Sequence, residues 1–99
     1  MVGNTTRSSK LYPKQLWWFT FRSEWFDMNE GHLNMLLQRE EDGTDFYFLH
    51  VPFSFFADNQ GDFDVRGEKF DLHISAQQHN FLQDIRGNGR ISFAEFLQT

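Results

Sequence analysis

The chain contains no cysteine among its 99 residues. This absence excludes a disulfide framework, a thiolate metal site and a cysteine nucleophile. The sequence also lacks any run of about eighteen apolar residues, so we predict no segment that spans a membrane. Its first ten residues, MVGNTTRSSK, lack the apolar stretch of a signal peptide, and we therefore expect a cytoplasmic location.

Basic residues are also scarce, because nine Lys and Arg stand against fourteen Asp and Glu, for a net charge of -5. A general nucleic-acid binder normally carries a basic stripe, so we consider nucleic acid an unlikely partner. A weak nucleic-acid-contacting accessory domain remains as a second alternative. It would depend on a small set of cations: Arg7, Lys10, Lys14, Arg86 and Arg90.

Aromatic residues, by contrast, are abundant: thirteen Phe, three Trp and two Tyr make up 18% of the chain. Each buried ring removes about 150–250 Å² from water, so roughly ten of them would supply a core for this length. We predict a single globular domain over residues 11–99, preceded by a flexible arm over residues 1–10. The surplus of aromatic residues predicts a contact patch on the surface.

Alternating apolar residues predict the strands of this domain. Leu33, Met35 and Leu37 alternate with more polar positions, and FYFLHV follows over residues 46–51, after Asp42-Gly43. This pattern predicts a central hairpin over about residues 33–51 with a type I′ turn at Asp-Gly. LWWFTF (residues 16–21) predicts a strand covered on both faces, and residues 70–74 predict another that is half buried.

Helices are predicted in three short segments. Residues 53–57 follow Pro52 and are expected to form a short helix that packs Phe55 and Phe56 onto the sheet. The capping box Ser75-Ala-Gln-Gln78 predicts a helix to about Gln83, and residues 91–97 predict a last short helix. The expected fold class is α+β: a small antiparallel sheet of three to five strands with one or two short C-terminal helices.

The segment DIRGNGRISFAEF, residues 84–96, carries the most specific motif. Counted from Asp84, the position 6 glycine is Gly89, and oxygen-bearing side chains stand at positions 1, 5, 9 and 12. Over these thirteen residues the chain resembles the EF-hand family. The resemblance implies a calcium loop whose candidate ligands are Asp84, Asn88, Ser92 and Glu95.

One position departs from that pattern, because Arg86 stands at position 3, where the family has an oxygen ligand. A guanidinium has only donors and a fixed positive charge, so it cannot ligate calcium. We therefore expect no metal, and we interpret the segment first as a tight turn at Gly87 and Gly89. A degenerate, calcium-responsive single EF-hand remains the alternative function.

No pattern for catalysis or cofactor binding is present. The four histidines show no i, i+4 pair, the acidic residues near Asp62 lack a nuclease arrangement, and no phosphate-binding glycine loop occurs. Trp17 and Trp18 are adjacent in a predicted strand, so they point to opposite faces and cannot form one stacking platform.

We therefore predict a small, acidic, aromatic-rich interaction module that is not an enzyme and needs no cofactor. It would bind a protein partner or self-associate, as accessory, inhibitor or immunity-type domains do. The candidate partner-binding residues are Trp25, Phe63, Arg86 and Arg90.

Overall fold

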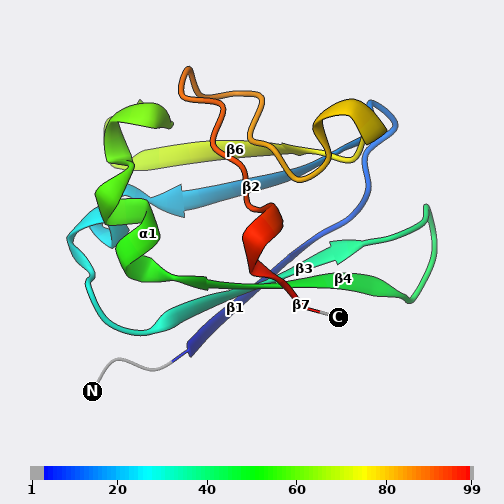
Figure 1. The fold of residues 1–99 in the computed structure, drawn as a ribbon, viewed down its shortest axis with the longest axis horizontal. Helices are drawn as coiled ribbons and strands as arrows, with labels where there is room; N and C mark the ends of the chain where they lie inside the picture. Colours follow the sequence, from blue (N-terminus) through cyan, green and yellow to red (C-terminus); the bar gives the residue numbers. More distant parts are fainter. Residues whose placement is uncertain (1–3, 99) are drawn as a thin grey trace.

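Two β-sheets lie face to face in the computed structural model, which describes residues 4–98 (Figure 1). One sheet has four strands in the order β1-β3-β4-β7, and the other has three in the order β2-β6-β5. They form one β-rich domain with a shared aromatic core. No helix within residues 4–98 combines the length and apolar character needed to cross a membrane.

The four-stranded sheet is built on the predicted hairpin, which is confirmed. β3 (His32–Gln38) pairs antiparallel with β4 (Phe46–Pro52), in a register that places Met35 opposite Leu49. β7 (Leu97–Gln98) extends the sheet antiparallel to β4. β1 (Asn4–Ser9) runs parallel to β3, so this sheet is mixed. The prediction of one small antiparallel sheet of three to five strands is therefore wrong, because the described strands form two sheets and one of them contains a parallel pair.

The three-stranded sheet is antiparallel. β2 (Leu16–Arg22) pairs with the predicted half-buried strand, β6 (Lys69–Ser75), and β6 forms a tight hairpin with β5 (Asp64–Arg66). β2 is an edge strand with one solvent-facing side, where Trp18 is 44% exposed. The prediction that both faces of this strand are covered is therefore wrong. Trp18 lies on the solvent-facing side with Thr20, so LWWFTF reads as apolar on both sides although only one side is buried.

The only α-helix among the described residues is α1 (Phe53–Asp58), which lies in the middle of the chain and confirms the predicted short helix. Pro52 precedes it, and Asn59 ends it by donating from Nδ2 to the carbonyl of Phe55 at 2.8 Å. Short 3₁₀ turns occur at η1 (Ser23–Asp27), η2 (Gln60–Asp62), η3 (Gln78–Asn80) and η4 (Ala94–Phe96).

The predicted C-terminal helices are wrong, because their serines make local turns instead. Ser75 Oγ donates to Asn80 Oδ1 and accepts from the backbone N–H of Gln77. Buried Leu82 then adopts a positive φ of 66°, which no helix allows. Ser92 Oγ accepts only from the N–H of Ala94, and the chain turns into β7 after one 3₁₀ turn.

Two further predictions need correction. The predicted flexible arm is wrong for residues 4–9, which form β1, while residues 1–3 lie outside the described residues. The hairpin turn is not type I′, because Asp42 has a φ of 60° while Gly43 has no positive φ. Gly43 donates instead to the carbonyl of Glu40 at 2.9 Å, at the end of a longer loop.

The core between the sheets is mainly aromatic. Phe70 lies at its centre and is fully buried, with the ring of Phe26 at 4.4 Å and that of Phe21 at 5.6 Å. Phe53 and Phe56 from α1 and Phe93 from the C-terminal segment close one side of the core. The large aromatic content of the sequence, 18%, is therefore used mostly for packing between the two sheets.

Candidate functional site

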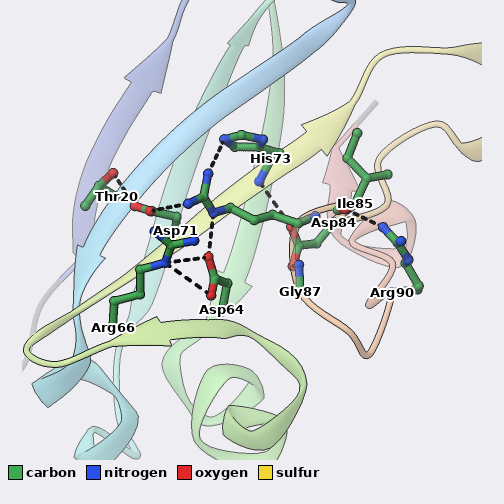
Figure 2. A network of polar contacts seen from close by, with 10 residues as sticks. Thr20, Asp64, Arg66, Asp71, His73, Asp84, Ile85, Gly87 and Arg90 are labelled. Carbon is green, nitrogen blue, oxygen red and sulfur yellow. Dashed lines mark hydrogen bonds and ion pairs between the residues drawn. The ribbon is translucent and has the colours of Figure 1, made fainter.

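A network of polar contacts lies on the outer face of the three-stranded sheet, and Figure 2 shows Asp64, Asp71 and His73 within it. Arg86 is the centre of this network. Arg86 Nε donates to Asp64 Oδ2 at 2.6 Å, and Arg86 Nη2 lies 3.4 Å from Asp71 Oδ2. Nη1 of the same guanidinium lies 3.2 Å from His73 Nε2. Thr20 Oγ1 donates to Asp71 Oδ1 at 2.6 Å, which extends the network to β2. One arginine from the C-terminal loop thus ties together β5 and β6.

Charge within this network is nearly balanced. Asp64 also accepts from Arg66 Nε at 3.2 Å. The hydrogen bond from Arg86 is the main cause that lowers the pKa of the Asp64 carboxyl, and Arg66 adds to it. Since the Arg86 side chain is 21% exposed and engages two carboxylates, little of its charge faces an incoming partner.

Asp84 anchors the loop that supplies Arg86. Its side chain is fully buried, and Oδ1 accepts from the backbone N–H groups of His73 and Arg86, each at 3.1 Å. Oδ2 accepts from the N–H of Gly87 at 3.2 Å. Burial raises the pKa of the Asp84 carboxyl, while these three donors act in the opposite direction. The carboxylate therefore holds a tight turn against β6.

This turn accounts for the resemblance to an EF-hand loop. Both oxygens of Asp84 already accept backbone N–H groups, and Gly89 donates to the carbonyl of Asp62, which lies outside the loop. Asn88, Ser92 and Glu95 are all exposed, whereas Asp84 is buried. Among residues 4–98, no three His, Cys, Asp or Glu side chains converge into a group that could hold a metal ion.

His73 has an electrostatic environment that favours its neutral form. Burial is the main cause that lowers the pKa of His73, the Arg86 charge adds to it, and nearby carboxylates oppose both. Because a guanidinium only donates, His73 Nε2 accepts and the ring proton lies on Nδ1. The Trp18 ring packs edge-on against the imidazole, with the ring centroids 5.0 Å apart.

We expect His73 to titrate below its ordinary pKa of 6.5 in an NMR titration of the imidazole protons. Between the lowered pKa of the folded protein and 6.5, the unfolded chain binds more protons at His73 than the folded protein does. The contribution of neutral His73 to stability is therefore present above pH 6.5 and is lost as the pH falls through the folded pKa. Arg86→Met should bring the pKa of His73 closer to 6.5. A pKa at or above 6.5 in the unaltered protein would contradict this electrostatic description.

A second feature is a groove at the open corner of the two sheets, between β1 and the edge of β2. It has a volume of about 720 Å³ and is lined by Arg7, Thr20, Phe21, Arg22, Glu24, Trp25 and Lys69. Trp25 is half buried here, because it stacks on the Phe21 ring at 4.6 Å and lies under the Arg7 guanidinium at 5.7 Å.

A third feature is the outer face of the four-stranded sheet. Leu36 of β3 lies opposite Phe48 of β4, and Phe46 of the same strand is 43% exposed. Farther along this face, the rings of His32 and His50 stack 4.1 Å apart and nearly parallel. The helix α1 and the C-terminal segment lie on the other side of this sheet, toward β2 and β6 (Figure 1).

The structure distributes the predicted partner-binding residues over different environments. Phe63 is 6% exposed and belongs to the core, and Arg86 is paired with acidic side chains. Arg90 is exposed and donates to the carbonyl of Ile85, while Trp25 lines the groove. Sequence patterns give no sign that Leu36, Phe46 or Phe48 faces outward, because each lies in an uninterrupted apolar run.

Comparisons with known proteins leave the fold and these surfaces as the basis for any functional conclusion. No protein-family model, no curated protein and no solved structure matches the chain.

Proposed function

We propose that this chain is a protein-interaction domain without catalytic activity. Its contact surface is the outer face of the four-stranded sheet, and the observation that carries the proposal is the apolar patch formed by Leu36, Phe46 and Phe48. The outward side of an antiparallel pair is usually polar, so three large apolar side chains there call for a covering partner.

The position of this patch supports a role in binding. Phe46 and Phe48 lie two residues apart on β4 and therefore point to the same side, next to Leu36 on β3. Aromatic side chains are enriched at protein interfaces and provide much of their binding energy. The patch occupies rigid, paired strands, so little conformational entropy would be lost when a partner covers it.

Charge next to the patch indicates the chemistry of the partner. The hairpin loop beside Phe46 carries a group of acidic residues: Glu40, Glu41, Asp42 and Asp45. This loop contains no basic residue, and Arg39, at its base, packs over the Tyr47 ring at 4.4 Å. A partner surface with an apolar centre and a basic rim would complement both the patch and the loop.

The titratable side chains of the Arg86 network form ion pairs and cap a turn, which supports a domain without catalytic activity. In the Arg86 network, Asp64 and Asp71 neutralise a guanidinium, and Asp84 caps a turn. Burial and the Arg86 charge lower the pKa of His73, which favours its neutral form. The calcium-responsive alternative is less well supported, since calcium would have to displace the backbone donors of Asp84.

Phe46→Glu tests the proposal, and Val65→Glu provides a matched control because Val65 is 42% exposed on β5, in the other sheet. Proteins captured from the cells that express the chain would be purified and titrated by calorimetry. We expect Phe46→Glu to weaken the specific partner by roughly thirtyfold, as for an aromatic hot spot. Val65→Glu should change the affinity by less than about twofold.

Sedimentation equilibrium measures the oligomeric state and so tests whether the partner is a second copy of the chain. A dimer that dissociates with Phe46→Glu and persists with Val65→Glu would place self-association at the same patch. If purified partners bind Phe46→Glu as tightly as the unaltered protein, the proposed surface is wrong. It is also wrong if the chain neither binds a protein nor self-associates.

A further inference from the structure

The edge of β2 that faces away from β6 carries backbone groups without ladder partners. The N–H of Trp18 points to this edge, where it donates to Ser9 Oγ at 3.0 Å. On the other strand, the N–H of His73 points away from β2, toward Asp84. Pairs in an antiparallel ladder alternate, so the N–H and C=O groups of Thr20 and Arg22 also face the open edge.

This edge borders the groove at the open corner of the sheets. β1 and β2 meet where Ser9 contacts Trp18, and in Figure 1 they separate toward their far ends. The groove of about 720 Å³ occupies this opening, with Trp25 among its lining residues and Arg7 on the side of β1. From Arg22 to Phe19, before β1 meets β2 at Trp18, the edge offers room for about four residues of an extended chain.

The charge of the groove is opposite to that of the whole molecule. The net charge is -5, yet three basic side chains, Arg7, Arg22 and Lys69, line the groove with one carboxylate, Glu24. Arg22 and Lys69 are direct cross-strand neighbours. The Arg22–Glu24 pair has a 3.5 Å separation and highly exposed side chains (75% and 67%), so it is weak and easily exchanged for another carboxylate.

We propose that the open edge of β2 binds an extended acidic segment of a partner protein, which adds an antiparallel strand to the three-stranded sheet. Thr20 and Arg22 supply the backbone hydrogen bonds, and Arg22 and Lys69 supply the positive charge. This second surface does not include the patch around Phe46. Strand addition to an exposed sheet edge is a general way to bind peptides.

The geometry also defines the side-chain pattern of the bound segment. Thr20 and Arg22 point to the outer face of the sheet, so the residues directly opposite them also point outward, beside Arg22 and Lys69. Intervening residues point inward, toward Phe21 and Trp25. The segment that fits best alternates acidic and apolar residues, and the N–H groups of its acidic residues face β2.

Nucleic acid fits the same groove less well. The Trp25 ring has one face against Phe21 and lies beneath the Arg7 guanidinium, so it offers no open platform for a base. Glu24 adds a negative charge within the groove. A phosphate backbone could accept from the N–H groups of this edge but would leave its C=O groups without donors, whereas an added peptide strand satisfies both.

The probe is a capped peptide of seven alternating residues, Ac-Glu-Val-Glu-Val-Glu-Val-Glu-NH₂, titrated into ¹⁵N-labelled protein. We expect saturable shifts of the Thr20 and Arg22 amides. N-methylation of the glutamate amides should abolish these shifts, whereas N-methylation of the valine amides should preserve them. Since both methylated peptides are tested on the unaltered protein, this comparison does not depend on the folding of a variant.

A charge exchange tests the second half of the proposal. The double variant Arg22→Glu, Lys69→Glu should bind the glutamate peptide at least roughly tenfold more weakly. The same variant should gain affinity for a peptide in which lysine replaces glutamate. Phe46→Glu should bind the probe like the unaltered protein, which separates this proposal from the one made for the other sheet.

Three outcomes would overturn the proposal. The first is the absence of shifts at Thr20 and Arg22 with millimolar peptide, and the second is an equal effect of the two N-methylated peptides. The third is binding of octathymidylate at these amides when the peptide does not bind, since the groove would then be a nucleic-acid site.

Discussion

Replacing Phe70 with alanine is expected to lower the free energy of unfolding by about 3–5 kcal/mol, as for other fully buried phenylalanines. Phe70 has no exposed surface, and its ring lies 4.4–5.9 Å from those of Phe21, Phe26, Phe56 and Phe63. The strands and α1 around it hold these neighbours in place, so the cavity cannot collapse. Urea denaturation followed by tryptophan fluorescence measures the change.

Phe46→Ala provides the matched control, because it removes the same atoms from a side chain that is 43% exposed. We expect this substitution to change the free energy of unfolding by no more than about 0.5 kcal/mol. Equal losses for the two substitutions would mean that Phe70 does not occupy the centre of the core.

Gly87→Ala is expected to destabilise the protein by about 3 kcal/mol, the upper end of the range for overpacking. A Cβ at this position would overlap the backbone oxygen of Asp62, and it would lie 2.9 Å from Phe63 Cα and 2.8 Å from Asp84 Oδ2. These are mostly backbone atoms in a buried turn, and they cannot move aside as the end of a flexible side chain could.

Gly61→Ala is the control for this substitution, since a Cβ at Gly61 would meet no atom within 4 Å. Its φ is not in the positive region, so alanine should be neutral or stabilising by up to about 1 kcal/mol. Thermal unfolding of both variants checks the pair. A stable Gly87→Ala protein would show that the turn does not pack against Asp62 and Phe63.

The elements predicted correctly from the sequence are those that local patterns define. Alternation identified the hairpin of β3 and β4 and also β6, and Pro52 marked the start of α1. β1 could not be found this way, because its polar residues occupy an open edge and only Ser9 is buried. The predicted C-terminal helices do not form, because Ser75 and Ser92 make local hydrogen bonds that favour turns. Ser75 donates to Asn80, and Ser92 accepts from the N–H of Ala94.

The surfaces were harder to predict, since they depend on contacts between distant segments. Arg86 stood out as the residue that breaks a calcium motif, but its pairing with Asp64, twenty-two positions away, could not be derived from spacing. The outward patch was concealed in FYFLHV, where every second residue faces the core. A strand with apolar residues on both sides gives no sign of which side is buried.

The alternation of the chain between the two sheets has a consequence for its synthesis. β1 pairs with β3 and β2 pairs with β6, so each of these strands is synthesised before its partner. β4 gains its second neighbour only when β7 is made. A nascent chain that has left the ribosome only as far as α1 therefore contains the hairpin but exposes β2 without a partner strand. This aromatic strand therefore stays accessible to chaperones until β6 has been synthesised. It stays accessible for some time afterwards, because pairing over long sequence separations is slow.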